Sequence, residues 1–459
     1  MRLELKDKRV LVLGLGDTGL SALRWLYRQG TRLSVADTRE TPPGVDALKA
    51  EMPTVKLHTG AFKEAAFKDA EVIVISPGVP KAEPLVQDAM RRGVPVVGDV
   101  ELFAQFKPAS AKVIAITGAN GKSTVTTLVG EMCKAAGLKT VVAGNIGLPV
   151  LDTLNGEVPD VYVLELSSFQ LETTSSLNAD ASTVLNISED HMDRYQGLED
   201  YAAAKARIFA GHGVQVLNRQ DAWSMGMAIQ GRVCVTFGLD QAANAADYGL
   251  SHQADKTLLM RGNQELLDTR MMKIAGLHNA ANALAAMALC EAIGVSQTAM
   301  LKALHEFKGL PHRVQWVADI NKIAFYDDSK GTNVGATYAA LRGLVSPNSQ
   351  RRIVLIAGGD GKGQDFTPLH AIVKTNARAV VLIGHDAPQI EAALQGSGVQ
   401  VLHGANLENA VEQAYQVAVQ GDAVLLSPAC ASFDMFRNYV HRAEVFVQSV
   451  KALASKEAA

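Results

Sequence analysis

A glycine-hinged loop that ends in Lys-Ser-Thr follows directly after an apolar, β-branched run at residues 113–117. Gly118 and Gly121 allow backbone N–H groups to approach phosphate oxygens closely. Lys122 supplies a positive charge for the β- and γ-phosphates, and Ser123 offers a hydroxyl ligand to Mg²⁺. The loop therefore predicts a binding site for the phosphates of a nucleoside triphosphate.

This loop departs from the standard phosphate-binding pattern in one respect. That pattern has a glycine five positions before Gly121, where this chain has Ile116. Only the shorter form G-x-x-G-K-S, at residues 118–123, is present. The alternative interpretation is a tight strand-to-helix turn that carries an exposed lysine.

A second glycine motif, GLGDTG at residues 14–19, lies between an apolar run at 10–13 and a helical stretch at 20–29. Asp37 ends the next apolar run, about twenty residues after the turn, as in a Rossmann fingerprint. The motif therefore indicates a site for a dinucleotide or a nucleoside diphosphate. The alternative is a turn whose glycines only allow a helix to pack closely on a strand.

Polar side chains also follow later apolar runs, at the carboxyl edge where parallel sheets bind ligands. Glu165 follows the run at 161–164, and His191 follows a strand expected at 182–187. Mg²⁺ prefers hard oxygen ligands, so Glu165 is the expected carboxylate at the triphosphate, and His191 could reach a second metal ion or the transferred phosphate. The alternative for His191 is a hydrogen-bonding surface residue. The acids around His191 have an alternative interpretation too, as solvated residues of a loop. These acids are Glu189, Asp190 and Asp193.

Two later loops each carry one lysine among glycines, YDDSKGTN at 326–333 and GGDGKG at 358–363. A lysine beside exposed backbone N–H groups suits an anion, either a phosphate or a carboxylate substrate. The segment SPACASFD at 427–434 places Ser432 at an expected helix start, which also suits a carboxylate. Each loop alone is compatible with a solvated turn, but two at adjacent strand ends favour an anion site.

The apolar runs alternate with helical stretches, which predicts an α/β fold with parallel sheets. A length of 459 residues suggests about three domains. We expect an N-terminal Rossmann-like domain at residues 1–100, a central P-loop-type ATPase domain at 101–310 and a C-terminal Rossmann-like domain at 311–459. Further strands are expected at 33–36, 72–75, 94–97, 323–326, 353–357, 379–383 and 423–426. Pro95 makes the strand at 94–97 the least secure.

Composition narrows the class of protein. The formal net charge is −3, with Lys and Arg spread along the chain, so no electrostatic footprint of a nucleic-acid binder is present. The charged N-terminus is followed by too few apolar residues for a signal peptide or a membrane span. Four cysteines lie far apart and mostly among apolar neighbours, which is typical of reduced thiols: Cys133, Cys234, Cys290 and Cys430. We expect a cytoplasmic monomer without membrane insertion.

Six motifs in order resemble those of the Mur ligases, over nearly the entire chain. They are TGANGKST at 117–124, GNIG at 144–147, ELSSFQ at 165–170, LHNAANAL at 277–284, LPHR at 310–313 and DSK at 328–330. Five further motifs resemble the members that add D-glutamate: LGLGDTGLS at 13–21, DTR at 37–39, SPG at 76–78, GGDGK at 358–362 and LSPACAS at 426–432. The element DNPR, which marks the members that add diaminopimelate, is absent from the sequence.

The resemblance implies ATP-dependent amide-bond formation in the cytoplasmic synthesis of peptidoglycan precursors. The γ-phosphoryl group of ATP passes to the carboxylate of UDP-N-acetylmuramoyl-L-alanine, which gives an acyl phosphate. The amine of D-glutamate then attacks through a tetrahedral intermediate, and ADP and phosphate are released. A carboxylate is a poor electrophile, so it must be activated, and the enzyme contributes mainly positioning and charge stabilisation.

The resemblance also implies roles for individual residues. The expected contacts of the UDP substrate are Asp17, Thr18, Asp37, Thr38, Arg39, Ser76, Gly78 and Asn145. The expected contacts of ATP are Gly118, Asn120, Gly121, Lys122, Ser123, Thr124, Asn279, Asn282, Arg313 and Asp328. The expected contacts of D-glutamate are Lys330, Thr332, Lys362, Ser432 and Tyr439. The expected catalytic residues are Lys122, His191 and Lys205, and two Mg²⁺ ions are expected at Ser123, Glu165, His191 and Lys205.

Lys205 matches a lysine that is carbamylated in the family. An ammonium group beside Mg²⁺ would be repelled, whereas a carbamate supplies the carboxylate oxygens that a hard cation prefers. The residues alone predict only a solvated lysine on a helix. The sequence departs from the family at Tyr439, where phenylalanine is frequent, and at Phe433, where leucine is usual, which blurs the details of the glutamate pocket.

Three alternative functions remain open at this stage. One is another amide ligase of the same superfamily, such as a different Mur ligase or an enzyme similar to folylpolyglutamate synthase. A second is a nicotinamide-dependent oxidoreductase built on Gly14, Gly16 and Gly19, which leaves the Lys122 loop unexplained. The third is a non-catalytic, nucleotide-regulated scaffold, which predicts no substrate-dependent ATP turnover.

Overall fold

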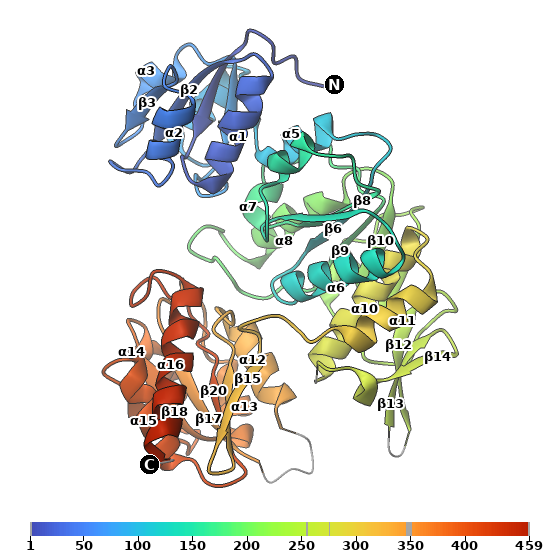
Figure 1. The fold of residues 1–459 in the computed structure, drawn as a ribbon, viewed down its shortest axis with the longest axis vertical. Helices are drawn as coiled ribbons and strands as arrows, with labels where there is room; N and C mark the ends of the chain where they lie inside the picture. Colours follow the sequence, from blue (N-terminus) through green and yellow to red (C-terminus); the bar gives the residue numbers. More distant parts are fainter. Residues whose placement is uncertain (1, 254–255, 275, 346–350, 458–459) are drawn as a thin grey trace. The chain divides into compact units, whose positions relative to one another are not determined.

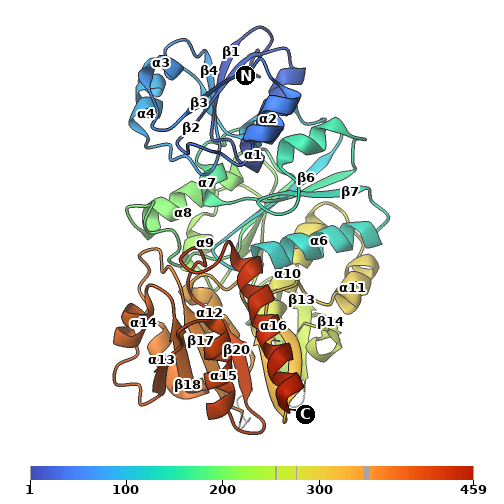
Figure 2. The ribbon, with the colours of Figure 1, turned by 60° about the vertical axis from the view of Figure 1, so that its left-hand side comes forward.

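The computed structural model describes residues 2–253, 256–274, 276–345 and 351–457. The chain divides into two compact units (Figures 1 and 2). The first contains Met1–Ile187, Glu199–Asp268 and Asn282–His305, and the second contains Ser188–Leu198, Thr269–Ala281 and Glu306–Ala459. Three sheets are present in the described ranges, two in the first unit and one in the second. This α/β architecture confirms the predicted fold class.

The N-terminal sheet is parallel and has the strand order β3-β2-β1-β4-β5. Its strands are β1 (Arg9–Leu13), β2 (Arg32–Asp37), β3 (Lys56–Thr59), β4 (Val72–Ile75) and β5 (Val96–Val97). Its helices are α1 (Asp17–Arg28), α2 (Val45–Glu51), α3 (Glu64–Phe67) and α4 (Pro84–Arg91), and α5 (Asp99–Phe106) follows. The order turns at β1, because β2 and β4 lie on either side of it, and the crevice at such a switch point is where open α/β sheets bind ligands.

The central sheet has the order β14-β13-β12-β11-β10-β9-β6-β8-β7 in the described residues. Its strands are β6 (Lys112–Thr117), β7 (Thr140–Gly144), β8 (Val161–Glu165), β9 (Ala181–Val184), β10 (Val214–Asn218), β11 (Cys234–Phe237), β12 (Tyr248–Gln253), β13 (Lys256–Arg261) and β14 (Gln264–Asp268). The strands from β7 to β12 are parallel, and β12, β13 and β14 form an antiparallel extension.

Helices and short 3₁₀ turns connect these central strands. They are α6 (Lys122–Ala135), η1 (Val150–Asn155), α7 (Ser168–Leu171), α8 (Leu198–Ala206), η2 (Arg207–Phe209), α9 (Ala222–Gly226), η3 (Thr269–Met271), α10 (Leu277–Ala292) and α11 (Gln297–Glu306).

The sheet of the second unit has the order β15-β16-β20-β17-β18-β19, and all neighbours are parallel except β15 and β16. Its strands are β15 (Gln315–Ile320), β16 (Ile323–Asp327), β17 (Ile353–Gly358), β18 (Ala377–Ile383), β19 (Gln400–His403) and β20 (Ala423–Leu426). Its helices are α12 (Val334–Gly343), α13 (Leu369–Asn376), α14 (Ala387–Ala393), α15 (Leu407–Val417) and α16 (Tyr439–Glu457).

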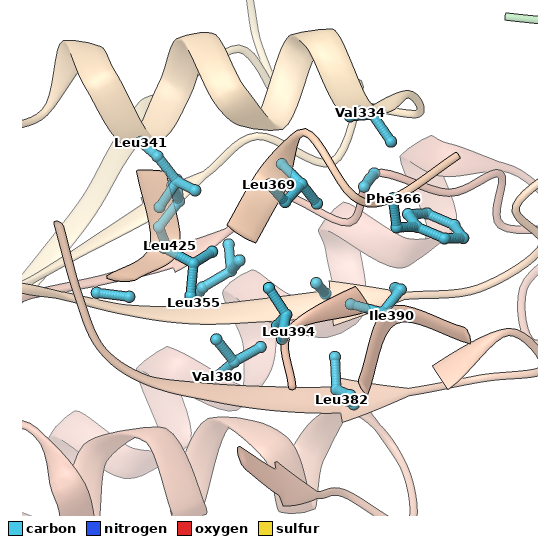
Figure 3. Close-up of a cluster of buried hydrophobic side chains, with 14 of the residues drawn as sticks. Val334, Leu341, Leu355, Phe366, Leu369, Val380, Leu382, Ile390, Leu394 and Leu425 are labelled. Atoms are coloured by element: carbon cyan, nitrogen blue, oxygen red, sulfur yellow. The ribbon is translucent and has the colours of Figure 1, made fainter. Parts of the chain in front are cut away.

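Helices cover both faces of this last sheet. Leu355 and Val380 face α12, α13 and α14, where they pack in a cluster with Leu341 and Leu369 (Figure 3). The alternate residues of the same strands, such as Val354 and Val381, pack with side chains of α15 and α16. Burial on both faces explains why these strands are continuous apolar runs in the sequence.

Two expected strands are corrected by the structure. The strand expected at 182–187 ends at Val184. Leu185 N–H still donates to Thr117 O at the end of β6, at 2.9 Å, and Asn186 O accepts the N–H of Ala119 in the phosphate loop, at 2.9 Å. The strand expected at 94–97 is reduced to Val96–Val97, directly after Pro95, which has no N–H to donate.

Candidate functional site

The predicted UDP-substrate residues line one cavity of about 640 Å³ in the first unit. All eight are present in its wall: Asp17, Thr18, Asp37, Thr38, Arg39, Ser76, Gly78 and Asn145. The cavity is polar, and part of its wall, around Asn145, Pro149 and Gln170, comes from the segment that precedes and follows β8. The loops at the switch point of the N-terminal sheet therefore form a pocket of the size that a nucleotide requires.

The glycines of the first motif have different structural roles. A Cβ atom at Gly19 would lie 1.9 Å from the carbonyl oxygen of Gly14, so this glycine allows α1 to pack closely on the turn. At Gly16, by contrast, a Cβ atom would meet no atom within 4 Å, and Gly16 lines the cavity. The turn thus combines a packing constraint with an open backbone surface that a diphosphate could approach.

Asp37 is held rigidly at the end of β2. Its Oδ2 atom accepts the Leu15 N–H at 2.7 Å, and its Oδ1 atom accepts Nε of Arg39 at 2.8 Å. Burial opposes the charge on Asp37, but the hydrogen bonds from Arg39 and Leu15 outweigh it and lower its pKa to about 2. Asp37 is therefore an ionised acceptor with a fixed orientation in the wall of the cavity.

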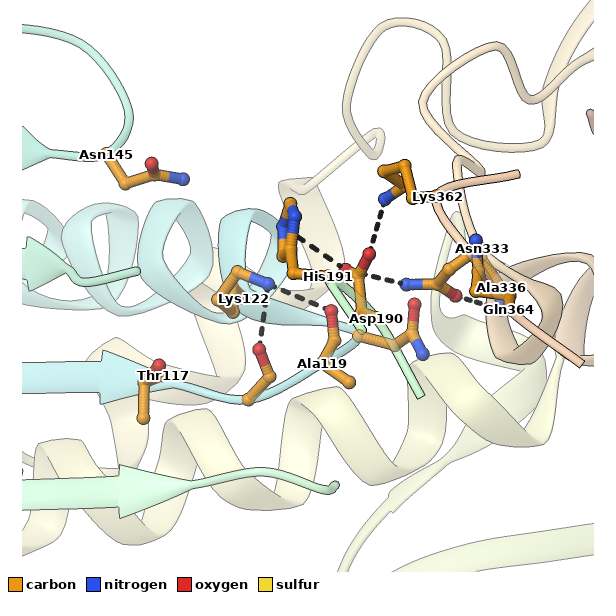
Figure 4. Close-up of polar contacts among 12 residues, drawn as sticks. Thr117, Ala119, Lys122, Asn145, Asp190, His191, Asn333, Ala336, Lys362 and Gln364 are labelled. Carbon is orange, nitrogen blue, oxygen red and sulfur yellow. Dashed lines mark hydrogen bonds and ion pairs between the residues drawn. The ribbon is translucent and has the colours of Figure 1, made fainter. Parts of the chain in front are cut away.

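The predicted phosphate loop runs from β6 into the N-terminus of α6. Gly121 precedes the helix with φ +87°, a left-handed conformation that favours glycine. Lys122 folds back over the loop, and its Nζ atom donates to the carbonyl oxygens of Gly118 at 2.8 Å and Ala119 at 2.9 Å (Figure 4). The loop conformation and the helix N-terminus are those expected for binding phosphate.

Four other predicted ATP contacts lie at this loop or at the start of α6. Asn120 N–H donates to Oδ1 of Asn186 at 2.8 Å, which fixes the middle of the loop. A Cβ atom at Gly121 would lie 2.5 Å from Oδ1 of Asn282, so this asparagine packs directly against the loop. Ser123 and Thr124 are buried in the first turn of α6.

Glu165 is the last residue of β8, and only one of its two carboxylate oxygens is bonded to a described residue. Its Oε1 atom accepts Nδ2 of Asn145 at 2.8 Å, whereas its buried Oε2 atom has no hydrogen-bond partner among the described residues. A buried carboxylate oxygen without a partner is costly, and a bound cation would satisfy it, so Glu165 fits the expected role. In the described ranges, no group of three or more His, Cys, Asp or Glu side chains could hold a metal ion, but the expected ligands also include a serine and a modified lysine.

Lys205 also reaches the phosphate loop, so the interpretation as a solvated lysine is wrong. Lys205 is 1% exposed, and its Nζ atom donates to Gly118 O at 3.0 Å and to Oγ1 of Thr117 at 3.3 Å. The ammonium group also lies 4.6 Å from the centre of the Tyr201 ring. Lys205 lies on α8, far from the loop in the sequence, and folding brings its side chain into contact with the loop.

The remaining predicted residues belong to the second unit: His191, Asn279, Arg313, Asp328, Lys330, Thr332, Lys362, Ser432 and Tyr439. Asp328 is buried at the end of β16, where its Oδ2 atom accepts Oγ of Ser427 at 2.7 Å. Burial raises the pKa of Asp328 to about 6, against the opposing charge of Arg313 and the hydrogen bond from Ser427.

The structure places the two predicted lysines of the amino-acid pocket in different surroundings. Nζ of Lys330 lies 5.7 Å from the centre of the Tyr439 ring, a cation–π contact. Lys362 has φ +54° and forms an ion pair with Asp190 (Figure 4). Ser432 is buried, and its carbonyl oxygen accepts the Phe436 N–H at 2.7 Å. The helix expected to begin at Ser432 begins only at Tyr439, so that prediction is wrong.

Several residues at these loops were not predicted from the sequence. The buried Gln364 accepts the Val334 N–H at 3.0 Å and donates to Gly361 O at 2.8 Å. The buried Arg442 of α16 donates to Ser329 O at 2.9 Å and to Cys430 O at 3.1 Å. Gln364 lies next to a glycine-lysine loop, which is a weak signal, whereas nothing in the sequence around Arg442 marks it.

His312 and Asp327 form a further link that was not predicted. Nδ1 of His312 lies 2.7 Å from Oδ2 of Asp327, and Oδ1 of the same carboxylate accepts the Ser329 N–H at 2.9 Å. The His312 ring also contacts the Tyr439 ring edge-on, at a centroid distance of 6.3 Å. His312 lies within the motif LPHR, so its position could have suggested a role.

Known protein families and known proteins match this chain along most of its length. Three family models match the chain: the N-terminal domain of MurD-like Mur ligases at residues 8–98, the Mur ligase middle domain at 116–290 and the glutamate ligase domain of Mur ligases at 312–430. A protein of Methylobacillus flagellatus named UDP-N-acetylmuramoylalanine–D-glutamate ligase is 68% identical over 99% of both chains. A protein of the same name from Thiobacillus denitrificans is 56% identical, over 99% of this chain and 98% of its own length.

Solved structures with much lower identity share the fold. The UDP-N-acetylmuramate-alanine ligase MurC of Thermotoga maritima has a TM-score of 0.60 at 20% identity and covers 97% of this chain and 100% of its own. MurF of Acinetobacter baumannii has a TM-score of 0.62 at 16% identity, over 96% of this chain and 93% of its own. From the domain models and the full-length relatives, the chain belongs to the Mur ligase family.

Proposed function

We propose that this chain is an ATP-dependent ligase that adds D-glutamate to UDP-N-acetylmuramoyl-L-alanine in peptidoglycan synthesis. Full-length relatives with this name, 68% and 56% identical, support the reaction. The observation that carries the proposal in the structure is the phosphate loop, which Lys122 and Lys205 both contact beside the buried carboxylate Glu165. These groups suit phosphoryl transfer from ATP to a carboxylate.

The chemistry requires that the enzyme activates one substrate and orients the other. The backbone N–H groups at the start of α6 and the Lys122 ammonium group bind the phosphates of ATP and stabilise charge that develops during transfer. The terminal phosphoryl group moves to the alanyl carboxylate, and ADP leaves. The amine of D-glutamate then attacks the acyl phosphate, phosphate leaves, and the amide remains.

The residues present fit Mg²⁺ as the cofactor. Ser123 and the unsatisfied Oε2 atom of Glu165 supply the hard oxygen ligands that Mg²⁺ prefers. When bound, the ion neutralises charge on the phosphates and withdraws electrons from the transferred group. We assign a second ion to His191 and to Lys205 in its carbamylated form.

The contacts of Lys205 support its carbamylation. Nζ of Lys205 and Nζ of Lys122 both donate to the carbonyl oxygen of Gly118, at 3.0 Å and 2.8 Å. Two ammonium groups that share one carbonyl oxygen repel each other, and here one of them, Lys205, is buried. Carbamylation of Lys205 converts one of these cations into an anion, removes the repulsion and adds oxygen ligands for the cation.

The two other substrates are assigned to the remaining sites. We assign the UDP group to the cavity at the N-terminal sheet, where Asp37, Thr38 and Arg39 contact uracil and ribose and Ser76, Gly78 and Asn145 contact the diphosphate and sugar. D-glutamate is assigned to the loops of the second unit, where the cations Lys330 and Lys362 and the hydroxyls of Thr332 and Ser432 match two carboxylates. Residues 1–100, 101–310 and 311–459 are proposed as the corresponding domains.

The proposal extends to the setting of the enzyme. No helix in the described part of the chain is long and apolar enough to cross a membrane. We propose that the enzyme acts in the cytoplasm as a monomer on small-molecule substrates and binds no nucleic acid. Its net charge of −3 and the reduced state expected of its cysteines are consistent with this setting.

Product analysis tests the proposal. The enzyme is incubated with Mg²⁺, ATP, UDP-N-acetylmuramoyl-L-alanine and D-glutamate, and the UDP product is analysed by mass spectrometry. The expected product carries one added glutamyl residue, and its formation stops when any one substrate is omitted. ATP hydrolysis that proceeds equally without the UDP substrate, with no mass increase, would contradict the proposed reaction.

A further inference from the structure

Asp190 connects two loops of the second unit that the proposed function assigns to D-glutamate. Its Oδ1 atom forms an ion pair with Nζ of Lys362, and its Oδ2 atom accepts Nδ2 of Asn333 at 3.3 Å (Figure 4). Asp190 itself comes from neither loop but from the segment Ser188–Leu198. One carboxylate thus bridges a residue next to Thr332 and the lysine of the second glycine-rich loop.

The partners of Asp190 are themselves fixed. Asn333 caps the N-terminus of α12, because its Oδ1 atom accepts the Ala336 N–H at 2.8 Å. Gln364 connects the same two loops through Val334 and Gly361. The backbone of Lys362 is therefore well anchored, and only the long side chain needs a partner to fix its ammonium group.

Burial strengthens the attraction between Lys362 and Asp190. The side chains of Lys362 and Asp190 are 13% and 9% exposed, so little solvent screens the charges. A lysine is a point charge on a flexible stem with several rotatable bonds, and without a buried partner it would sample many rotamers. With Asp190 on one side, the ammonium group is restricted and can present its other N–H donors to a further anion.

We infer that Asp190 is a positioning residue for amino-acid binding, which acts by holding the Lys362 ammonium group in place for a substrate carboxylate. This inference rests on the proposed function, because it takes D-glutamate as the ligand of Lys362. The charge of Lys362 fits the ligand, because an ammonium group that Asp190 holds in place can still donate to a carboxylate of the amino acid. Asp190 also contacts Asn333, so it fixes the position of the loop that contains Thr332 relative to the Lys362 side chain.

The test compares three single variants by steady-state kinetics. Asp190→Asn keeps the size of the side chain and removes its charge, and it should raise KM for D-glutamate at least about tenfold, the effect of one hydrogen bond to a charged group. KM for the UDP substrate should stay within about twofold of the wild type, which a general structural defect would not allow. KM for ATP is not used as this control, because Oδ2 of Asp190 also lies 3.7 Å from Nε2 of His191. Asp190→Glu keeps the charge and should recover part of the loss. The control Glu189→Gln, which changes the neighbouring acid that accepts the Asp365 N–H at 3.1 Å, should keep the wild-type KM.

A double variant shows whether Asp190 acts through Lys362. In the background of Lys362→Met, the additional change Asp190→Asn should raise KM for D-glutamate by less than about twofold. Calorimetric titration of D-glutamate gives the same comparison for variants whose turnover is too slow to measure. The inference is overturned if Asp190→Asn leaves KM unchanged or lowers it, or if the effects of the two changes multiply. A wild-type enzyme without any D-glutamate-dependent phosphate release would instead overturn the proposed function together with this inference.

Discussion

Two lysines from different helices donate to one carbonyl oxygen in the phosphate loop. Lys122 lies at the start of α6 and Lys205 near the end of α8, yet both Nζ atoms lie within 3.0 Å of Gly118 O. We propose that the two lysines have different tasks: Lys122 would place a charge on the phosphates, and Lys205, once carbamylated, would supply an anionic ligand. Single substitutions can distinguish the two.

Lys122→Ala should lower kcat by about 10²–10³, because one preorganised charge contact to the transferred phosphate is lost. Turnover of ATP with both other substrates at saturation measures the effect. Lys134→Ala, at an exposed lysine on the same helix that pairs with Glu131, is the matched control and should keep the wild-type rate. A rate near that of the wild type for Lys122→Ala would rule out its role at the phosphates.

Lys205→Ala should also lower kcat, but here short-chain carboxylic acids such as acetate should restore part of the activity, because they can replace the missing carbamate oxygens. The same acids should not restore Lys122→Ala. Activity is measured over a range of acid concentrations at constant ionic strength. If no acid restores Lys205→Ala, the assignment of a carbamate to this residue is wrong.

For single residues, the sequence predicted the type of ligand better than it predicted which side chains are buried and which contacts they make. The spacing of Gly118, Gly121 and Lys122 indicates a phosphate loop because all three are local to one turn. The burial of Lys205 and the bridging contact of Asp190 depend on segments that meet only after folding, so the residue types alone suggested solvated side chains. Family resemblance placed Lys205 at a metal, but no motif drew attention to Asp190 as a partner of Lys362.

At the scale of the element, α5 begins at a buried acid. Asp99 is the first residue of this helix, and its Oδ2 atom accepts Nε2 of Gln170 at 3.4 Å, while its buried Oδ1 atom has no hydrogen-bond partner among the described residues. Burial raises the pKa of Asp99 to about 6, although the Val100 N–H and Gln170 oppose the shift. The ionised carboxylate therefore destabilises the folded first unit at neutral pH.

Asp99→Asn should stabilise the protein at pH 7.5, on the order of 1–3 kcal/mol, because the amide carries no charge to bury. Between about pH 4 and about pH 6 the folded wild type keeps a proton that the unfolded chain releases, so its stability falls as pH rises through this window and the cost is complete above it. The gain in Tm of the variant over the wild type should thus be largest at pH 7.5 and smallest near pH 4. An equal gain at both pH values, or a lower Tm at pH 7.5, would contradict the buried charge.

Several of the strands that the sequence predicted most closely are buried on both faces. The strands β1, β4, β17 and β20 are short apolar runs and were found close to their actual bounds. Strands at sheet edges were missed, such as β3 (KLHT) and β19 (QVLH), because half-exposed residues leave no apolar run. The antiparallel extension β12–β14 was missed for the same reason, since its strands mix polar and apolar residues.

At the scale of the whole molecule, βαβ alternation was enough to predict three α/β sheets but not their strand orders. In the central sheet β6 lies between β9 and β8, a crossover arrangement that chain order does not specify. The residues assigned to ATP are divided between the two units, with Lys122 in the first and Asp328 in the second.

Binding of ATP together with both other substrates, or with a non-reactive substrate analogue, should draw the two units together, because ATP contacts are assigned to both. Small-angle scattering should show a smaller radius of gyration with the complete ligand set than without ligands. Addition of the UDP substrate alone should have a smaller effect, since its cavity lies within the first unit. An unchanged scattering profile with all ligands bound would argue against closure.

The most direct test of the proposed function is a ligase assay with a panel of amino acids. The enzyme is supplied with ATP, Mg²⁺ and UDP-N-acetylmuramoyl-L-alanine, and phosphate release is measured with D-glutamate, L-glutamate, glycine, L-lysine and diaminopimelate in turn. We predict rapid release with D-glutamate and release near background with the others. Release with L-glutamate or diaminopimelate but not with D-glutamate would contradict the assignment of the substrate.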